Sequence, residues 1–143
     1  LPLWEQGLDY NHGTGHGVGF ILSVHEGPQS FRWRSADGRR ITLEEGMVIS
    51  NEPGYYEAGK FGIRHENLVL VRTGETTDYG RFMYLEPLTM APFDRDAIDV
   101  SLLTEAELAQ LNDYHRLVYD TVAPLLPAEE QAWLAAATAP LHR

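Results

Sequence analysis

The stretch MVISNEPGYYEAGKFGIRHENLVLV, residues 47–71, decides the fold. Apolar and polar residues alternate along MVISNEPGYY and again along GIRHENLVLVRTG, which predicts two β-strands. Side chains two residues apart point to the same face of a strand. The alternation therefore gives each strand one shared face, formed by Val48, Ser50 and Glu52 on the first and by Arg64, Glu66, Leu68 and Leu70 on the second.

A glutamate in a mostly apolar strand is costly to bury unless it is paired. Glu52 and Glu66 lie on consecutive strands, so their carboxylates can face one another and share a cation, which would offset that cost. The alternative is that both side chains face water. Arg64, on the same strand face as Glu66, and the histidines upstream favour the shared cation.

Further β-structure is expected around this stretch, over residues 29–92. SFRWRS alternates and leads through the turn dipeptide Asp37-Gly38 into RRITL, and FMYLEPLTM is another candidate strand. Pro53-Gly54 and Thr73-Gly74 are expected to be turns that end the strands before them.

The C-terminal region, residues 101–143, is predicted to be helical. Thr104 and Glu107 have the spacing of a capping box. The side chains that follow at intervals of three and four form one face of an amphipathic helix: Leu108, Leu111, His115, Val118 and Val122. Pro124 and Pro127 end this helix, and AEEQAWLAAAT is a second, shorter one. Strands followed by helices make the expected fold class α+β.

Composition limits the possible functions. The chain has 143 residues, enough for one modest domain with a single core. Its net charge of -10 would repel phosphate backbones, which disfavours nucleic acid as a partner. No apolar run is long enough to cross a membrane. The absence of cysteine excludes disulfides and thiolate metal sites and suits a cytoplasmic enzyme.

The beginning of the chain gives no targeting signal. LPLWEQGLDY lacks the basic and apolar regions of a signal peptide. It also lacks an initiator methionine, which leaves open that Leu1 is not the natural start.

Glycine and histidine are concentrated in residues 1–28, as HGTGHGVG (12–19) and HEGP (25–28). Glycine disfavours a helix, so we expect a tightly folded backbone that can approach a ligand closely. VGFIL (18–22) is expected to be a short apolar element within it. The glycine spacing does not match the dinucleotide fingerprint, no P-loop lysine follows, and no H-E-x-x-H pair is present.

His16, Glu52 and Glu66 together make a nitrogen-and-carboxylate ligand set. Hard oxygen donors with one imidazole suit manganese, cobalt, iron or zinc, and they do not suit copper(I). The ligand set does not choose among these metals.

The order and spacing of these motifs resemble those of the cytosolic-type Xaa-Pro aminopeptidases. The resemblance rests on HGTGHGVG, VHEGP, EEGMVISNEPGYYEAGKFGIRHENLVLV, YLEPLT and LNDYHRLV, and it extends over nearly the whole chain. These enzymes belong with prolidase, creatinase and methionine aminopeptidase to the pita-bread metallopeptidases. The resemblance implies the second half of a pita-bread fold, with a curved, mainly antiparallel sheet over residues 1–92 and a helical extension over residues 93–143.

The resemblance also implies a role for each matching residue. His16, Glu52 and Glu66 are expected to bind metal, with Glu66 bridging two divalent ions in the complete enzyme. The metal is expected to be manganese, with zinc or cobalt as alternatives. His12 and His25 are expected to bind substrate and move protons, together with Glu52. Arg64 is expected to organise the site and Tyr56 to contact the substrate.

The implied activity is release of the N-terminal residue from peptides with proline in second position, by a cytoplasmic homodimer. No part of this chain corresponds to two aspartate ligands of the family, or to its N-terminal domain. We therefore expect a fragment that holds at most one weakly bound ion and is inactive by itself. The alternatives are a prolidase-type dipeptidase and a non-catalytic pita-bread protein that serves as a binding module.

Overall fold

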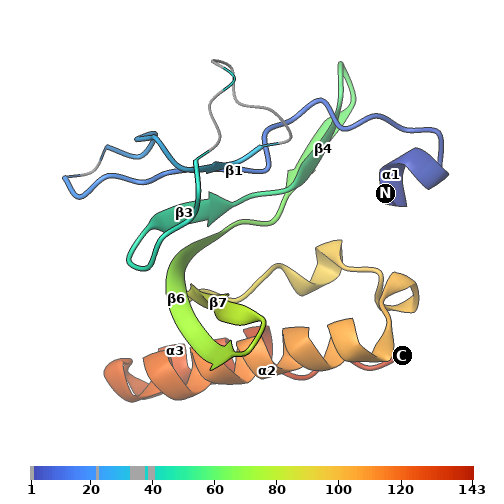
Figure 1. Ribbon diagram of the computed structural model, residues 1–143. Coiled ribbons are helices and arrows are strands. Elements are labelled where there is room, and N and C mark those ends of the chain that lie inside the picture. Colours follow the sequence, from blue (N-terminus) through green and yellow to red (C-terminus); the bar gives the residue numbers. More distant parts are fainter. Residues whose placement is uncertain (1, 22, 33–37, 39–40) are drawn as a thin grey trace. The chain divides into compact units, whose positions relative to one another are not determined.

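The computed structural model describes residues 2–21, 23–32, 38 and 41–143 (Figure 1). The chain forms two compact units, Leu1–Thr89 and Met90–Arg143. In the described part of the chain, every strand lies in the first unit and both long helices lie in the second. The predicted α+β class is therefore confirmed, whereas the domain boundary expected at residues 92–93 stays a prediction.

The strands of the first unit pair only in the antiparallel sense within the described residues. A three-stranded sheet has the order β3-β6-β7, and two further pairs are β4-β5 and β1-β2. The strands are β1 (Gly15–His16), β2 (Ser30–Phe31), β3 (Val48–Asn51), β4 (Gly54–Glu57), β5 (Phe61–Arg64), β6 (Asn67–Thr77) and β7 (Gly80–Pro87). A short helix, α1 (Pro2–Glu5), precedes them and was not expected.

The decisive stretch folds as two strand pairs in one continuous register. Asn51 pairs with Asn67 at the end of β3 and β6, and Gly54 pairs with Arg64 at the start of β4 and β5. Pro53 lies between these pairings and has no N–H to donate, so the ladder is interrupted there. The same register places Glu52 opposite Glu66 at the interruption.

Two turns expected from the sequence are corrected by this arrangement. Pro53-Gly54 is a break in a ladder, and the turn of the hairpin lies instead at Gly59, whose φ is 73°. The strand expected over GIRHENLVLVRTG is divided between β5 and β6. Thr73-Gly74 does not end β6, because the glycine lies where the register with β7 shifts, a common position for a strand glycine.

Other expectations in the first unit have mixed outcomes. The strand expected at FMYLEPLTM is confirmed as β7, which begins at Gly80. VGFIL is not a strand over its described residues, and Phe20 and Ile21 are exposed. Of SFRWRS only Ser30–Phe31 is seen as a strand, and the hairpin expected at Asp37-Gly38 lies largely outside the described residues.

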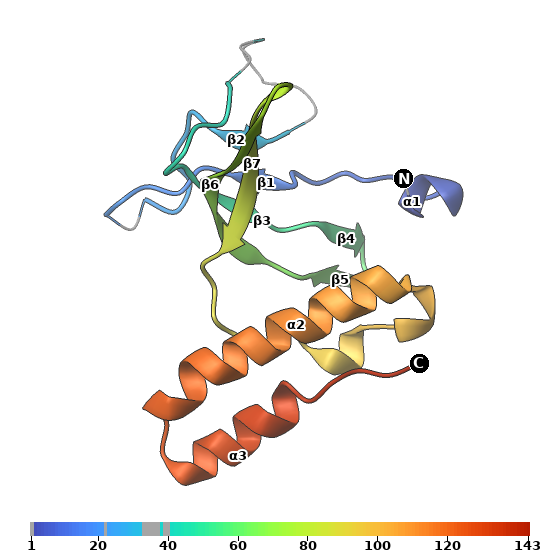
Figure 2. The ribbon, with the colours of Figure 1, turned by 60° about the horizontal axis from the view of Figure 1, so that its bottom comes forward.

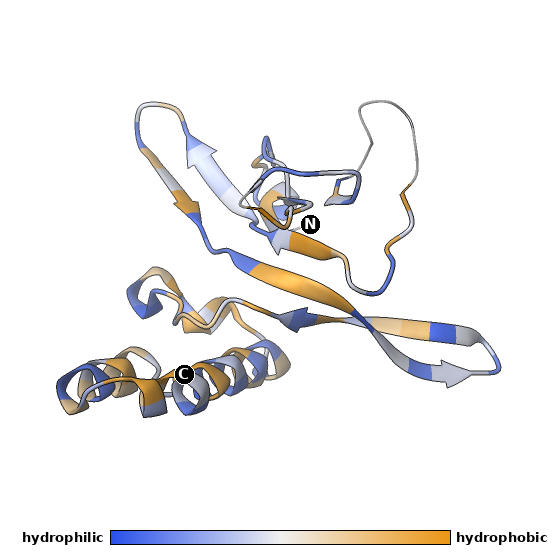
Figure 3. Cartoon of the chain, turned by 90° about the vertical axis from the view of Figure 1, so that its left-hand side faces the viewer, coloured by the Kyte–Doolittle hydropathy of each residue, from blue (hydrophilic) through white to orange (hydrophobic). Residues whose placement is uncertain are grey.

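The core of the first unit lies on one face of the three-stranded sheet. Ile49 of β3 and Val69 and Val71 of β6 are buried together. Figure 3 shows the apolar stretches of these strands in orange. Ile49 alternates with Ser50, so the opposite face of β3 is free to present polar groups.

The helical unit follows the sequence prediction closely. Helix α2 (Glu105–Val122) begins with the Thr104–Glu107 capping box, in which both reciprocal hydrogen bonds form. Short 3-10 turns cover Arg95–Ala97, Val100–Leu102 and Ala123–Leu125, and helix α3 (Ala128–Ala137) comes after the last of them. Val118, Ala123 and Leu134 form the buried core that joins the two helices, which lie side by side in Figure 2. No described helix is long and apolar enough to cross a membrane.

His115 is a buried polar group in this helical core. Its side chain is fully buried, and its Nε2 accepts a hydrogen bond of 3.1 Å from the Phe93 backbone N–H. Burial, with the nearby positive charge of Arg95 as a second cause, lowers the pKa of His115. Protonation at Nε2 would also remove the acceptor for Phe93. The folded state therefore holds His115 neutral.

Acid is expected to destabilise the helical unit through His115. The folded pKa lies below that of the unfolded chain, so the stability is complete above the unfolded value of about 6.5 and falls as pH drops below it. Urea unfolding at pH 7.5 and pH 5.5, followed by circular dichroism, measures this loss. His115→Gln keeps an acceptor for Phe93 but cannot titrate, so its stability should change less between the two pH values. An equal change in both proteins would contradict the assignment.

Candidate metal and substrate site

The glycine-histidine segment lies directly along β3. The Glu52 N–H donates to the Thr14 carbonyl (2.8 Å), the Val18 N–H donates to the Val48 carbonyl (3.2 Å), and Gly17 forms a bridge with Ile49. Gly15 is buried at the closest point, where a Cβ atom would overlap the Ser50 carbonyl oxygen. This glycine therefore permits the close approach that brings the upstream histidines to β3.

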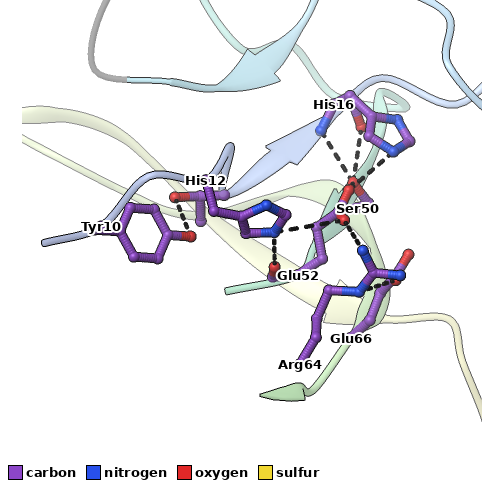
Figure 4. Close-up of polar contacts among 8 residues, drawn as sticks. Tyr10, His12, His16, Ser50, Glu52, Arg64 and Glu66 are labelled. Atoms are coloured by element: carbon purple, nitrogen blue, oxygen red, sulfur yellow. Dashed lines mark hydrogen bonds and ion pairs between the residues drawn. The ribbon is translucent and has the colours of Figure 1, made fainter. Parts of the chain in front are cut away.

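Glu52 lies at the centre of the polar contacts in Figure 4. The residue is only 7% exposed. Its Oε1 accepts a hydrogen bond from the Ser50 hydroxyl (2.9 Å) and lies 2.9 Å from His16 Nε2. Its Oε2 lies 3.3 Å from Arg64 Nη1. The buried carboxylate is thus surrounded by donors and positive charge, which offset its desolvation.

The ring of His16 is oriented by its own backbone. Nδ1 lies 2.9 Å from the Gly17 carbonyl oxygen, which can only accept, so Nδ1 carries a hydrogen. In the neutral ring Nε2 then has a lone pair directed at Glu52 Oε1. Two atoms that each present a lone pair to the other at 2.9 Å require a proton or a metal cation between them. The tautomer is the one that a metal ligand binding through Nε2 needs.

Arg64 lies between the two opposed glutamates. Its Nη1 is 3.3 Å from Glu52 Oε2 and its Nε is 3.4 Å from Glu66 Oε2. Like charges directly opposite on neighbouring strands repel, so the guanidinium is the cation that holds them together. Within the described residues, no three His, Asp or Glu side chains are gathered closely enough to hold a metal ion. The hard donors fit a divalent ion in chemistry, and ligation by His16, Glu52 and Glu66 stays a prediction.

His12 lies on the other side of Glu52. Its Nε2 is 2.9 Å from the Glu52 backbone carbonyl and therefore donates to it. The ring packs edge-on against Tyr56 (centroids 5.1 Å apart) and against Tyr10 (5.9 Å). The Tyr56 ring covers Gly54 and Gly62, where any Cβ would collide with it. His12 and Tyr56 thus form one continuous surface beside the carboxylate.

His25 reaches the same region from the VHEGP segment. Its ring lies 4.2 Å from that of His16, at an angle of 46°. The Glu26 N–H donates to the Gly17 carbonyl at 2.9 Å, which ties this segment to the backbone beside His16. His25 is exposed, so its ring can contact a substrate.

Comparison with known proteins gives a consistent result. Residues 2–73 match metallopeptidase family M24, and residues 81–141 match the C-terminal region of peptidase M24. The chain belongs to metallopeptidase family M24. The family resemblance stated from the sequence motifs is therefore confirmed.

Several relatives of this M24 chain are Xaa-Pro aminopeptidases. It is 52% identical to aminopeptidase P2 of Arabidopsis thaliana over 99% of this chain and 20% of that protein. It is 49% identical to a probable Xaa-Pro aminopeptidase P of Coprinopsis cinerea, over 97% of this chain and 23% of that protein. The chain thus spans about a fifth of the length of the curated relatives it matches.

A solved structure gives the same fold. X-prolyl aminopeptidase of Caenorhabditis elegans, described as a cytosolic enzyme with a di-nuclear active site, matches with a TM-score of 0.85 and 39% identity. The match covers 97% of this chain and 23% of that one. The predicted second half of a pita-bread fold, with C-terminal helices, is confirmed.

The structure brings every site residue predicted for this M24 chain into one network of contacts. The network joins His12, His16, His25, Glu52, Tyr56, Arg64 and Glu66. Sequence reasoning missed the contribution of Ser50, whose hydroxyl contacts both Glu52 and the His16 backbone. The alternation that placed Ser50 on the face of Glu52 was the available signal.

Proposed function

We propose that the protein containing this chain is a metal-dependent aminopeptidase that releases the N-terminal residue from peptides with proline in second position. One observation carries the proposal: Glu52 and Glu66 are opposed in one strand register, with a cation between them and His16 Nε2 directed at Glu52. The names of its close relatives support the same activity.

His16, Glu52 and Glu66 would hold divalent metal, and manganese is the ion we propose, with zinc or cobalt as alternatives. Two such ions would make water nucleophilic near neutral pH and polarise the scissile carbonyl. The di-nuclear site described for the nematode relative supports two ions in the complete protein. The two aspartates expected from the family would complete the ligand set, and the chain by itself would hold at most one weakly bound ion.

The remaining side chains would act on the substrate directly. His12 keeps a fixed orientation through the Glu52 carbonyl and lies against Tyr56, so both can line the pocket for the peptide. His25, exposed beside His16, can donate a proton to the leaving proline nitrogen or stabilise the tetrahedral oxyanion. Glu52 would handle protons, and Arg64 would hold the two opposed carboxylates together.

We propose the cytoplasm as the location and a homodimer as the assembly. The cytosolic description of the nematode relative supports the location. Leu102, Leu125 and Trp133 are exposed on the helical unit, so their side chains are available for such a contact. The net charge of -10 on this chain disfavours nucleic acid as a partner.

This function is tested by measuring how the complete protein cleaves three substrates: an Xaa-Pro-Xaa tripeptide, an Xaa-Pro dipeptide and an Xaa-Ala-Xaa tripeptide. We expect cleavage of the first, with loss of activity on chelation and recovery with Mn²⁺ above Zn²⁺ or Co²⁺. Activity confined to the dipeptide would instead indicate a prolidase. No cleavage at any metal concentration would indicate a non-catalytic binding module. Sedimentation of the same sample reports the dimer.

A further inference from the structure

Ser50 carries a hydroxyl that neither the core nor the proposed chemistry accounts for. It lies on β3 two residues before Glu52, and it is fully buried. Its neighbour Ile49 points to the opposite face and packs in the apolar core. Serine at this position is therefore not needed to fill the core, and its hydroxyl needs polar partners of its own.

Those partners are two residues of the proposed metal site. The Ser50 hydroxyl accepts a hydrogen bond of 3.0 Å from the His16 backbone N–H. It donates its single hydrogen to Glu52 Oε1 at 2.9 Å, in preference to the His16 carbonyl oxygen at 3.5 Å. The same Oε1 atom faces His16 Nε2 at 2.9 Å. The contacts close a ring of backbone N–H, hydroxyl, carboxylate and imidazole (Figure 4).

This ring determines how the carboxylate of Glu52 is turned. The Ser50 hydrogen occupies one lone pair of Oε1 and leaves another directed at His16 Nε2. Oε2 is left to Arg64 at 3.3 Å. Without the hydroxyl, Oε1 would have no donor from β3, and the charge of Arg64 would be free to draw the whole carboxylate toward itself. The His16 N–H would at the same time lose its acceptor.

We propose that Ser50 is a positioning residue that holds Glu52 Oε1 and His16 Nε2 toward a shared metal ion. The inference rests on the proposed function, because it assigns Ser50 to the same site. Ser50 touches neither substrate nor metal in this role and acts through Glu52. Hydrogen bonds that orient a ligand from behind typically change metal affinity by about 10- to 100-fold when they are removed.

The test measures Mn²⁺ affinity by calorimetry on the complete protein, independently of peptide cleavage. Ser50→Ala is expected to weaken Mn²⁺ binding by about 10- to 100-fold. At saturating Mn²⁺ it should lower kcat with little change in KM for the peptide. Ser50→Thr keeps the hydroxyl and should restore most of the affinity. Ile49→Val, the adjacent core residue on the other face, serves as the control for a general loss of stability and should bind Mn²⁺ like the parent protein.

If Ser50→Ala does not fold, Ser50→Cys fills the site with a slightly larger side chain that is only a weak donor, and it should still bind Mn²⁺ about tenfold more weakly. Affinity within threefold of the parent for the folded Ala or Cys variant overturns the inference. A loss in Ile49→Val as large as in Ser50→Ala overturns it too. Failure of the parent to cleave Xaa-Pro peptides while it still binds Mn²⁺ would sink the proposed function alone, because the affinity comparison then still decides the role of Ser50.

Discussion

Replacing Glu66 with glutamine is expected to weaken Mn²⁺ binding by more than about 100-fold, and peptide cleavage by the complete protein should fall at least as far. Removal of an outer hydrogen bond to a metal ligand costs up to about 100-fold, and loss of a ligand charge should exceed that. Glutamine keeps the shape of the side chain but cannot supply the negative charge that a bridging carboxylate contributes. Calorimetry with Mn²⁺ and release of the N-terminal residue measure the two effects.

The fold should tolerate this change. The contact of Glu66 with Arg64 is half-exposed, and such ion pairs contribute less than about 1 kcal/mol. Removing one of two opposed carboxylates also relieves repulsion with Glu52. Glu86→Gln is the matched control, because Glu86 is similarly exposed and pairs with Arg72 at 2.9 Å on the β6–β7 ladder. Equal Mn²⁺ affinity in the two variants would show that Glu66 is not a ligand.

The opposition of Glu52 and Glu66 was predictable because it follows from strand periodicity. Alternation assigned each glutamate a face, and the hairpin turn at Gly59 sets the register that places the two opposite each other. At Pro53-Gly54 the sequence predicts a turn, and the structure instead shows an interrupted ladder. Proline removes a hydrogen-bond donor, and a ladder can lose one bond without turning back. The pairing resumes beyond it at Gly54 and Arg64.

The helical unit was predictable for a different reason, since its signals are local. The capping box needs only Thr104 and Glu107, and the buried face needs only spacing along one helix. The neutral state of His115 depends on Phe93 and Arg95, which are distant in the sequence. Spacing placed His115 on the buried face but could not supply its partners.

The position of Arg64 between two carboxylates was beyond sequence reasoning. Alternation placed Arg64 and Glu66 on one face, but the strand is divided between them, at the interruption of the ladder. The guanidinium reaches Glu52 and Glu66 from this break. The contacts of the Ser50 hydroxyl depend likewise on the close approach of His16, which lies 34 residues earlier in the chain. Motif spacing predicts which groups take part, and only the backbone contact determines which atoms meet.

The close backbone contact between the glycine-histidine segment and β3 leads to a second prediction with a large effect, at Gly15. Gly15→Ala is expected to lower the free energy of unfolding by about 3 kcal/mol or more, because overpacking against backbone cannot be relieved by a rotamer change. The added Cβ would overlap the Ser50 carbonyl oxygen and lie 2.9 Å from its carbon and 3.1 Å from Phe31 Cδ2. β1 would have to move away from β3 and take His16 with it.

Gly13→Ala is the matched control, because Gly13 lies in the same segment but has no atom within 4 Å of its added Cβ. Its stability should stay within about 0.5 kcal/mol of the parent protein. Urea unfolding compares the two variants, and Mn²⁺ calorimetry under native conditions shows whether His16 has been displaced. Gly15→Ala should lose both stability and metal affinity, whereas Gly13→Ala should keep both. If the two variants behave alike, the close approach of the glycine-histidine segment to β3 does not hold the site together.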